Sequence, residues 1–289
     1  MASAQALARL LRISLAPSAL ADVVAGSCAG LAAGGSFRAA VLILAAASSL
    51  CVYHAGMALN DYADRRIDAR LRPERPIPSG AVPPRLALAA GGSLLAGSIL
   101  FAAWAGPEVL GVVAILSLLV LAYDFAAKRS AWTGPAVLGA CRALNLLLGA
   151  ACAAPPSYGR GLLLPAAGYG LYVFLVSHLA RMEDGVVRPA SAKVLALAGP
   201  WSLLLPSLAL PSLAGVAAAA AFAAFLVRPL FGIRDWTRKS VERTVGRLLG
   251  GTILLDASVA IGSGFLPVAL GLLLLYPLAR SLARRYPPT

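Results

Sequence analysis

Three aspartates with helical spacing stand out near the end of a long apolar run. Asp61, Asp64 and Asp68 lie within nine consecutive residues. A helix turns by about 100° per residue, so Asp64 and Asp68 fall about 60° and about 20° from Asp61, on one face. Clustered carboxylates repel one another unless a cation lies between them. Hard oxygen ligands without a neighbouring Cys or His favour Mg²⁺, which takes further oxygens from water and from a substrate phosphate.

A structural alternative exists for the same residues. Five arginines lie close to the aspartates in the sequence, so the carboxylates could belong to a solvated helix end with Asp–Arg pairs; these are Arg65, Arg66, Arg70, Arg72 and Arg75. The stretch, however, interrupts a chain that is otherwise apolar, and that context favours a functional site.

This stretch resembles the first signature of the UbiA superfamily of intramembrane prenyltransferases, and most of all its EboC-like branch. The residues in register are Asn60-Asp61-x-x-Asp64-x-x-x-Asp68, Arg72-x-x-Arg75-Pro76 and Ser79-Gly80. The resemblance implies Mg²⁺-dependent transfer of a prenyl group. The donor would be a prenyl diphosphate and the acceptor a small molecule, lipophilic or aromatic, within the membrane.

The resemblance also implies roles for these residues. Asp61, Asp64 and Asp68 would hold Mg²⁺ on the diphosphate, with Asn60 in the same motif, and metal and cations would stabilise the charge on the leaving group. Arg72 and Arg75 would neutralise diphosphate oxygens, together with Lys128 of a second cluster.

The second cluster is Tyr123-Asp124-x-x-x-Lys128-Arg129, at the end of another apolar run. It resembles the basic loop with which the family helps to hold the diphosphate. Ordinary anchoring by basic residues on the cytoplasmic side explains Lys128 and Arg129 equally well.

A third cluster, Ser177-His178-Leu179-Ala180-Arg181-Met182-Glu183-Asp184, stands where the family has a second Asp-rich motif that binds a second Mg²⁺. Here the acids are adjacent, so they point to different faces of a helix. Either Glu183 or Asp184 is sufficient as a metal ligand, or Arg181 replaces the charge of a second metal.

Several polar residues lie within apolar segments, where they are costly and often functional. Arg142 and Asn145 could line the cavity and contact the diphosphate or acceptor, or could form hydrogen bonds between helices. Asp22 and Asp256 could belong to an acceptor pocket or be paired structural acids. The tyrosines could stabilise a carbocation or lie at the membrane interface; they are Tyr53, Tyr169 and Tyr172.

The composition is that of a membrane protein. The 289 residues are 60% hydrophobic and only 13% charged, whereas soluble domains carry roughly 25% charged residues. The formal net charge of +13 is not concentrated in a separate basic domain, so nucleic-acid binding is not expected. The four cysteines form no C-x-x-C pair, so neither a zinc site nor a disulfide framework is predicted.

A membrane span needs about 20 apolar residues. Ten segments qualify, with the seventh broken or kinked by prolines: 14–34, 39–59, 85–105, 108–126, 134–153, 161–181, 192–210, 212–231, 244–262 and 265–282. The predicted fold is all-α, a single domain over residues 1–289. It is a multi-pass bundle of nine to ten transmembrane helices around a central cavity that opens to the cytoplasmic side.

The distribution of basic residues predicts the orientation. If the N-terminus is cytoplasmic, only Arg38 and Arg160 of the 25 lysines and arginines fall on the outer side. We therefore expect both termini and the Asp-rich loop on the cytoplasmic face, in a bacterial plasma membrane. Two functions of another class stay open: a carrier of lipids or prenyl compounds with altered catalysis, favoured by the degraded second motif, and a partner in a membrane complex.

Overall fold

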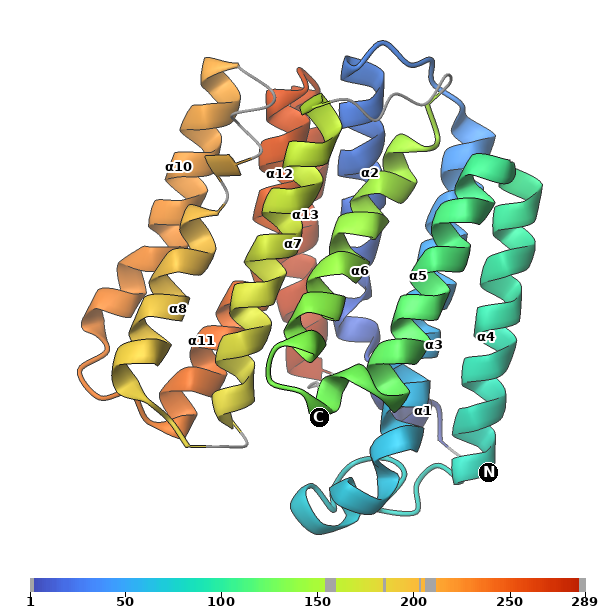
Figure 1. Ribbon diagram of the computed structural model, residues 1–289, viewed down its shortest axis with the longest axis vertical. Coiled ribbons are helices and arrows are strands. Elements are labelled where there is room, and N and C mark those ends of the chain that lie inside the picture. The colour runs from blue at the N-terminus through green and yellow to red at the C-terminus, as the bar shows by residue number, and fades with distance from the viewer. Residues whose placement is uncertain (1–2, 154–159, 184–185, 203, 206–211, 286–289) are drawn as a thin grey trace.

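The structure, a computed structural model, describes residues 3–153, 160–183, 186–202, 204–205 and 212–285. Every regular element within these ranges is a helix (Figure 1). The elements are α1 Ala4–Leu10, η1 Ile13–Leu15, α2 Ala16–Ala32, α3 Ala39–Leu71, α4 Pro84–Ala105, α5 Pro107–Phe125, η2 Ala127–Arg129, α6 Thr133–Ala150, α7 Arg160–Ala180, η3 Arg181–Glu183, α8 Pro189–Trp201, α10 Leu213–Val227, η4 Arg228–Gly232, α11 Arg238–Gly250, α12 Thr252–Gly262 and α13 Leu266–Arg285.

The long helices form a bundle of the predicted membrane-spanning kind. Within the described ranges, seven helical segments are long and apolar enough to cross a membrane, and one of them joins α11 to α12. The three other expected spans coincide with helices that are shorter or less apolar, namely α6, α8 and α13. The chain is an integral membrane protein with an all-α fold, as predicted.

Helix starts follow local chemistry. A proline occupies the first turn of α4, α5 and α8, where its missing N–H costs no helical hydrogen bond and its fixed φ suits the helix. Gly106 turns the chain between α4 and α5 with a φ of 130°, a value that L side chains rarely adopt. Helix α8 ends at Trp201 and contains Pro200 in its last turn, whereas Pro206 and Pro211 of the seventh predicted span lie outside the described residues.

One predicted boundary was wrong in a way that matters for function. The second span was expected to end at residue 59 and to lead into a loop, but α3 continues to Leu71. The Asp-rich motif is therefore the last part of a 33-residue helix. The continuous apolar pattern stops at residue 59, but the helical backbone hydrogen bonds continue through residues 60–71.

Close packing at the centre fixes the relative positions of α2 and α6. Gly26 of α2 faces the backbone of Leu146, and Gly149 of α6 faces the backbone of Val23. Glycines let two membrane helices approach to backbone contact. These two helices carry Asp22, Arg142 and Asn145, which form the buried polar network described below.

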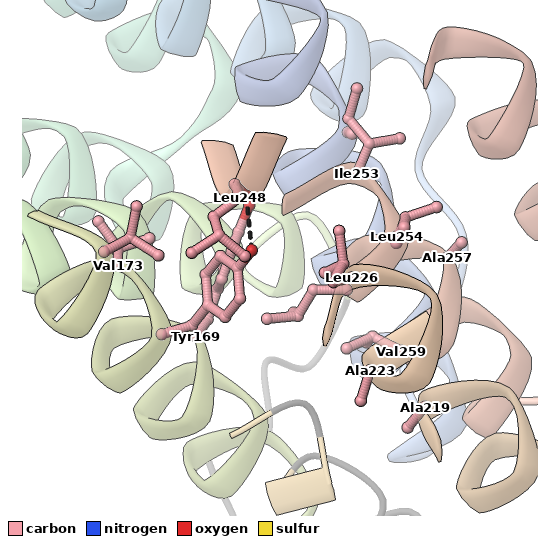
Figure 2. Packing of buried hydrophobic residues seen from close by; sticks show 14 of the residues in the cluster. Tyr169, Val173, Ala219, Ala223, Leu226, Leu248, Ile253, Leu254, Ala257 and Val259 are labelled. Carbon is pink, nitrogen blue, oxygen red and sulfur yellow. Dashed lines mark hydrogen bonds between the residues drawn. The ribbon is translucent and has the colours of Figure 1, made fainter. Parts of the chain in front are cut away.

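The C-terminal half has its own core around α7. Tyr172 of α7 is fully buried and its hydroxyl donates a 2.5 Å hydrogen bond to the carbonyl oxygen of Leu248 on α11. Leu226 of α10 and Ile253 of α12 are buried in the same cluster (Figure 2). Helices α7, α10, α11 and α12 are thereby packed as one wall of the bundle.

The first and last helices reach the same end of the bundle. Figure 1 shows α1, the C-terminal end of α13 and the turn after α3 at this end. This is the arrangement expected when the chain crosses the membrane an even number of times between α1 and the end of α13. We call it the Asp-rich end, after Asp61, Asp64 and Asp68.

Candidate active site

Asp61 lies at the centre of a charged cluster at the Asp-rich end. It is only 1% exposed, and its Oδ1 atom lies 3.3 Å from Nη2 of Arg12 and 3.6 Å from Nη1 of Arg75. The other oxygen, Oδ2, is buried without a hydrogen-bond partner among the described residues. A buried carboxylate oxygen without a partner is costly, which marks this position as more than a paired helix end.

Arg75 joins two of the three aspartates. Its Nη1 atom lies 2.7 Å from Oδ2 of Asp68, and the arginine is only 4% exposed. The chain turns back directly after α3, since the backbone N–H of Arg75 donates to the carbonyl of Arg72 and that of Ser79 to the carbonyl of Arg75. The Arg-x-x-Arg-Pro stretch thereby folds over the helix end that carries the acids.

Lys128 brings the second cluster to the first. Its Nζ atom lies 2.7 Å from Oδ1 of Asp64 and donates a 3.0 Å hydrogen bond to the side-chain oxygen of Asn60. Lys128 stands on η2, the short turn that follows α5. The predicted meeting of these two motifs is therefore seen in the structure, whereas their chemical roles stay a proposal.

Arg12 was not among the predicted site residues. It precedes η1 with a φ of 46°, in the left-handed region that non-glycine residues rarely adopt. Such outliers concentrate at functional sites. The sequence does not predict this contact, because Arg12 and Asp61 are 49 positions apart.

A cavity of about 280 Å³ lies next to the charged cluster. Its polar wall includes Arg12 and Asn60 near the Asp-rich end, and Arg142 and Asn145 deeper in the bundle. Most other lining residues are apolar: Leu15, Ala19, Val52, Gly56, Met57, Leu116, Val120, Leu138, Val173 and Leu249. The cavity therefore offers a charged end and an apolar body.

Asp124 is a second residue that sequence reasoning left out of the site. It lines the cavity, is only 2% exposed, and has a buried Oδ2 without a hydrogen-bond partner among the described residues. The signal was present in the sequence, because Asp124 stands four residues before Lys128, one helical turn away. Among the described residues that line the cavity, Asp124 is the one carboxylate, since Asp61, Asp64 and Asp68 lie beside the cavity and not in its wall.

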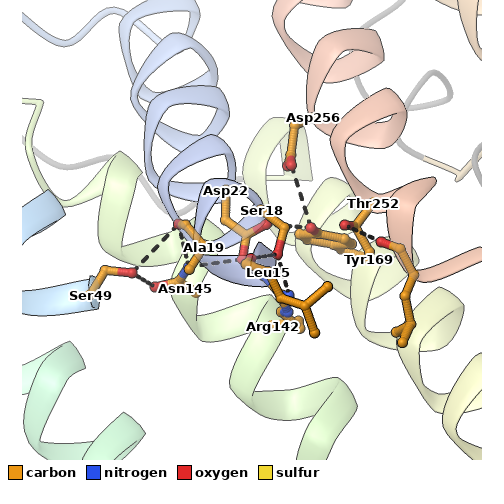
Figure 3. Close-up of polar contacts among 11 residues, drawn as sticks. Leu15, Ser18, Ala19, Asp22, Ser49, Arg142, Asn145, Tyr169, Thr252 and Asp256 are labelled. Atoms are coloured by element: carbon orange, nitrogen blue, oxygen red, sulfur yellow. Dashed lines mark hydrogen bonds and ion pairs between the residues drawn. The ribbon is translucent and has the colours of Figure 1, made fainter. Parts of the chain in front are cut away.

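A buried polar network holds the deeper wall of the cavity (Figure 3). Arg142 donates hydrogen bonds of 2.7 Å to Asp22 and to the hydroxyl of Ser18, and Asn145 donates one of 2.8 Å to Asp22. The hydroxyl of Tyr169 also donates to Asp22. Arg142 and Asn145 thus line the cavity and form hydrogen bonds between helices, whereas their contact with a diphosphate or an acceptor stays a prediction.

Other predicted residues are placed less centrally. Arg129 is exposed, and its side chain makes no hydrogen bond or ion pair within the described part of the chain. Arg181 donates a 3.0 Å hydrogen bond to the carbonyl oxygen of Lys128, so the third cluster contacts the second. Glu183 is half-buried on η3, Arg72 is half-buried at the end of α3, and Asp184 lies outside the described residues.

The tyrosines divide between two environments. Tyr53 lines the cavity, and its hydroxyl lies 3.5 Å from the carbonyl oxygen of Arg12. Tyr169 and Tyr172 are fully buried with their hydroxyls bonded inside the protein, and neither lines the cavity. Of the three, only Tyr53 is placed to face a bound molecule there.

The donor set suits a hard cation in its chemistry, although no three Asp, Glu, His or Cys side chains within the described ranges are placed as a metal cage. Each aspartate of α3 is close to an Arg or Lys instead. The buried free oxygens of Asp61 and Asp124 are the ligand atoms that Mg²⁺ prefers.

Comparison with known proteins agrees with this architecture. The model of the UbiA prenyltransferase family matches residues 19–287. A digeranylgeranylglyceryl phosphate synthase of Ignicoccus hospitalis is 30% identical over 220 residues, which are 74% of this chain and 70% of that protein. One of Methanothrix thermoacetophila is 32% identical over 122 residues, 42% of this chain and less than half (45%) of that protein.

Solved structures share the fold. A UbiA homolog from Aeropyrum pernix K1, solved without ligand, gives a TM-score of 0.67 at 22% identity and covers 84% of this chain and 97% of its own. A structure described as digeranylgeranylglyceryl phosphate synthase gives a TM-score of 0.63 at 16% identity and covers 91% of this chain and 99% of its own. With the family model matched over nearly its whole length, this chain belongs to the UbiA prenyltransferase family.

Proposed function

We propose that this protein transfers a prenyl group from a prenyl diphosphate to a lipophilic or aromatic acceptor within the membrane, and that it depends on Mg²⁺. One observation carries the proposal. The three aspartates of α3 and the cations Arg12, Arg75 and Lys128 meet beside a cavity whose body is apolar. A diphosphate needs the charged end and an isoprenoid chain needs the apolar one.

The cations have the first task. Arg12, Arg75 and Lys128 come from three separate segments and hold fixed positive charge where a diphosphate would leave. Preorganised charge at a developing anion lowers the barrier without reorganisation during the reaction. Asn60 orients Lys128 through its side-chain oxygen.

The acids have the second task. Asp61, Asp64 and Asp68 are the residues that would hold Mg²⁺, and Asp124 supplies a further carboxylate from the cavity wall. Bound Mg²⁺ would offset negative charge on the diphosphate oxygens. The apolar wall of the cavity would keep water from an allylic cation until the acceptor attacks. Glu183 and Asp184 are the positions for a second metal, with Arg181 as the alternative source of positive charge.

The names of the relatives support a prenyl transfer. The curated relatives are called digeranylgeranylglyceryl phosphate synthases, and that name describes a prenylated lipid phosphate. The match to the Methanothrix thermoacetophila protein spans less than half of its length, and identity to the solved structures is low. The acceptor is therefore proposed only as a class.

A direct assay tests this function. Protein purified in detergent is incubated with prenyl diphosphates of increasing length, Mg²⁺ and candidate aromatic or polar lipid acceptors, and pyrophosphate release is followed. We expect release that needs both Mg²⁺ and an acceptor and that is lost in Asp61→Asn. Pyrophosphate release that persists in Asp61→Asn, or that does not depend on Mg²⁺, would overturn the assignment.

We further propose that the Asp-rich end faces the cytoplasm of a bacterial cell. The basic residues of the loops gather at this end, as the positive-inside rule requires of a cytoplasmic face. Reporter fusions to the C-terminus test the orientation. Activity of a reporter that works only outside the cytoplasm would reverse it.

A second candidate is a carrier that binds prenyl compounds without turnover. The observation favouring it is that each aspartate of α3 lies within 4 Å of an Arg or Lys, as in a helix end stabilised by ion pairs. The carrier predicts prenyl diphosphate binding that is unchanged by chelation of Mg²⁺. The enzyme predicts binding that weakens when Mg²⁺ is removed.

A further inference from the structure

A second hollow of about 560 Å³ shares no lining residue with the cavity described above. It is formed by η4, α11 and α13, and three arginines line it: Arg243, Arg247 and Arg280. Two hydroxyl residues, Ser240 and Thr244, also line it, and none of its described lining residues is acidic. We call it the arginine groove.

None of the three arginines is ion-paired with a carboxylate in the described part of the chain. Arg247 instead lies 5.6 Å from the ring centre of Phe225, and Arg280 lies 5.8 Å from that of Tyr276. The Nε atom of Arg247 is buried and has no hydrogen-bond partner among the residues that the structure describes. The aromatic contacts hold the guanidinium groups in place but leave N–H donors for an anion.

The spacing brings these charges together. Arg243 and Arg247 are four residues apart on α11 and lie on one face of that helix. Arg280 comes from α13 on the other side of the groove. Three like charges converging on one hollow repel one another, and a phosphate that accepts from several guanidinium groups would remove this cost.

The surroundings are apolar in the manner of a lipid-facing surface. Large hydrophobic side chains are exposed on the same elements, including Phe231 of η4 and Leu274 and Leu278 of α13. Figure 1 shows α11 and the C-terminal part of α13 at the Asp-rich end of the bundle, where the apolar body gives way to the charged end. A molecule that fits both features has an anionic head and hydrocarbon chains.

We propose that the arginine groove binds the phosphate headgroup of an anionic membrane lipid. The chains of the lipid lie along the exposed apolar side chains of η4 and α13. The general excess of basic residues on one membrane face explains why arginines occur at this end. It does not explain why three of them line a single hollow whose described lining residues include no acid.

Native mass spectrometry of the full-length protein in detergent tests the proposal. The protein is titrated with phosphatidic acid, with phosphatidylcholine of the same chains, and with inorganic phosphate alone. The variants are Arg247→Gln and the pair Arg243→Gln with Arg280→Gln. Arg85→Gln is the control, because Arg85 is an exposed arginine near the start of α4 and does not line the groove.

We expect phosphatidic acid to bind more tightly than phosphatidylcholine and Arg247→Gln to weaken it about tenfold, as for the loss of a charge-assisted hydrogen bond. Arg85→Gln should bind like the unchanged protein. Equal binding of phosphatidic acid by unchanged protein and both groove variants would overturn the proposal. So would an equal loss in Arg85→Gln, or inorganic phosphate binding as tightly as the lipid, which would make the groove a site for a free anion.

Discussion

Nη2 of Arg12 lies 3.3 Å from Oδ1 of Asp61, although the two residues are 49 positions apart in the sequence. The contact ties the N-terminal segment, before the first long helix, to the end of α3. Arg12 and Arg75 thereby share the same oxygen of Asp61, Oδ1. Arg12 also lines the cavity beside this contact.

Arg12→Gln should lower prenyl transfer about tenfold, because a fixed positive charge is lost where the diphosphate would leave. Arg12→Lys keeps the charge and should retain a larger share of the activity. The measurement is turnover at saturating Mg²⁺, with thermal unfolding to show that the fold persists. Equal activity of Arg12→Gln and the unchanged protein would remove Arg12 from the site.

Asp61→Asn and Asp64→Asn should each reduce turnover by about 100-fold, since each removes charge from a hard-cation site with little change in shape. The double variant should lose far less than the product of the two effects, because metal and diphosphate bind as one unit. Higher Mg²⁺ should partly rescue the weaker single variant. Asp68→Asn should be milder, since Asp68 is held by Arg75 at 2.7 Å. Strictly multiplicative losses would argue against a shared metal.

Asp124→Asn should lower activity and raise the Mg²⁺ concentration needed for half-maximal turnover. The reason is that Asp124 lines the cavity and that its buried Oδ2 has no hydrogen-bond partner within the described part of the chain. Glu108→Gln is the matched control, because Glu108 lies on the same helix but in its first turn. A change in maximal rate without any change in Mg²⁺ dependence would show that Asp124 acts on something other than the metal.

Asp22→Asn should destabilise the protein by about 3 kcal/mol, because the charge of Arg142 loses its buried partner at 2.7 Å. Asp256→Asn should cost less, since Asp256 has no ion pair with an arginine in the described part of the chain and lies 3.4 Å from the Tyr169 hydroxyl. Thermal unfolding in detergent gives both values. The reverse order would mean that Asp256, not Asp22, carries the charge that Arg142 needs.

Gly149→Ala should destabilise the bundle by at least about 1–3 kcal/mol, because a Cβ there would overlap the backbone of Val23 on α2. Gly97→Ala is the control, since a Cβ at that position of α4 meets no heavy atom within 4 Å. The control should leave the unfolding temperature unchanged or slightly raised. Equal unfolding temperatures for the two variants would show that α2 and α6 can separate without cost.

Much of the candidate site could be predicted because helical spacing is periodic. Asp61, Asp64 and Asp68 share a face whatever surrounds them, since the helix repeat alone sets the angle between them. The sequence did not show that these aspartates belong to the same helix as the second membrane span, because the apolar pattern stops at residue 59 although α3 runs on to Leu71. It also gave Arg129 the same weight as its neighbour Lys128, yet only Lys128 turns toward Asp64.

The sequence by itself determined the class of the protein. The excess of apolar residues and the length of the apolar segments required a bundle of membrane-spanning helices, since backbone polar groups must be satisfied without water. Tertiary structure alone decided which charges meet. Arg12 reaches Asp61 and Asp22 reaches Arg142 across 49 and 120 positions of sequence, because packing between helices, including the glycine contact of α2 with α6, sets these distances. Local periodicity carries no information on such contacts.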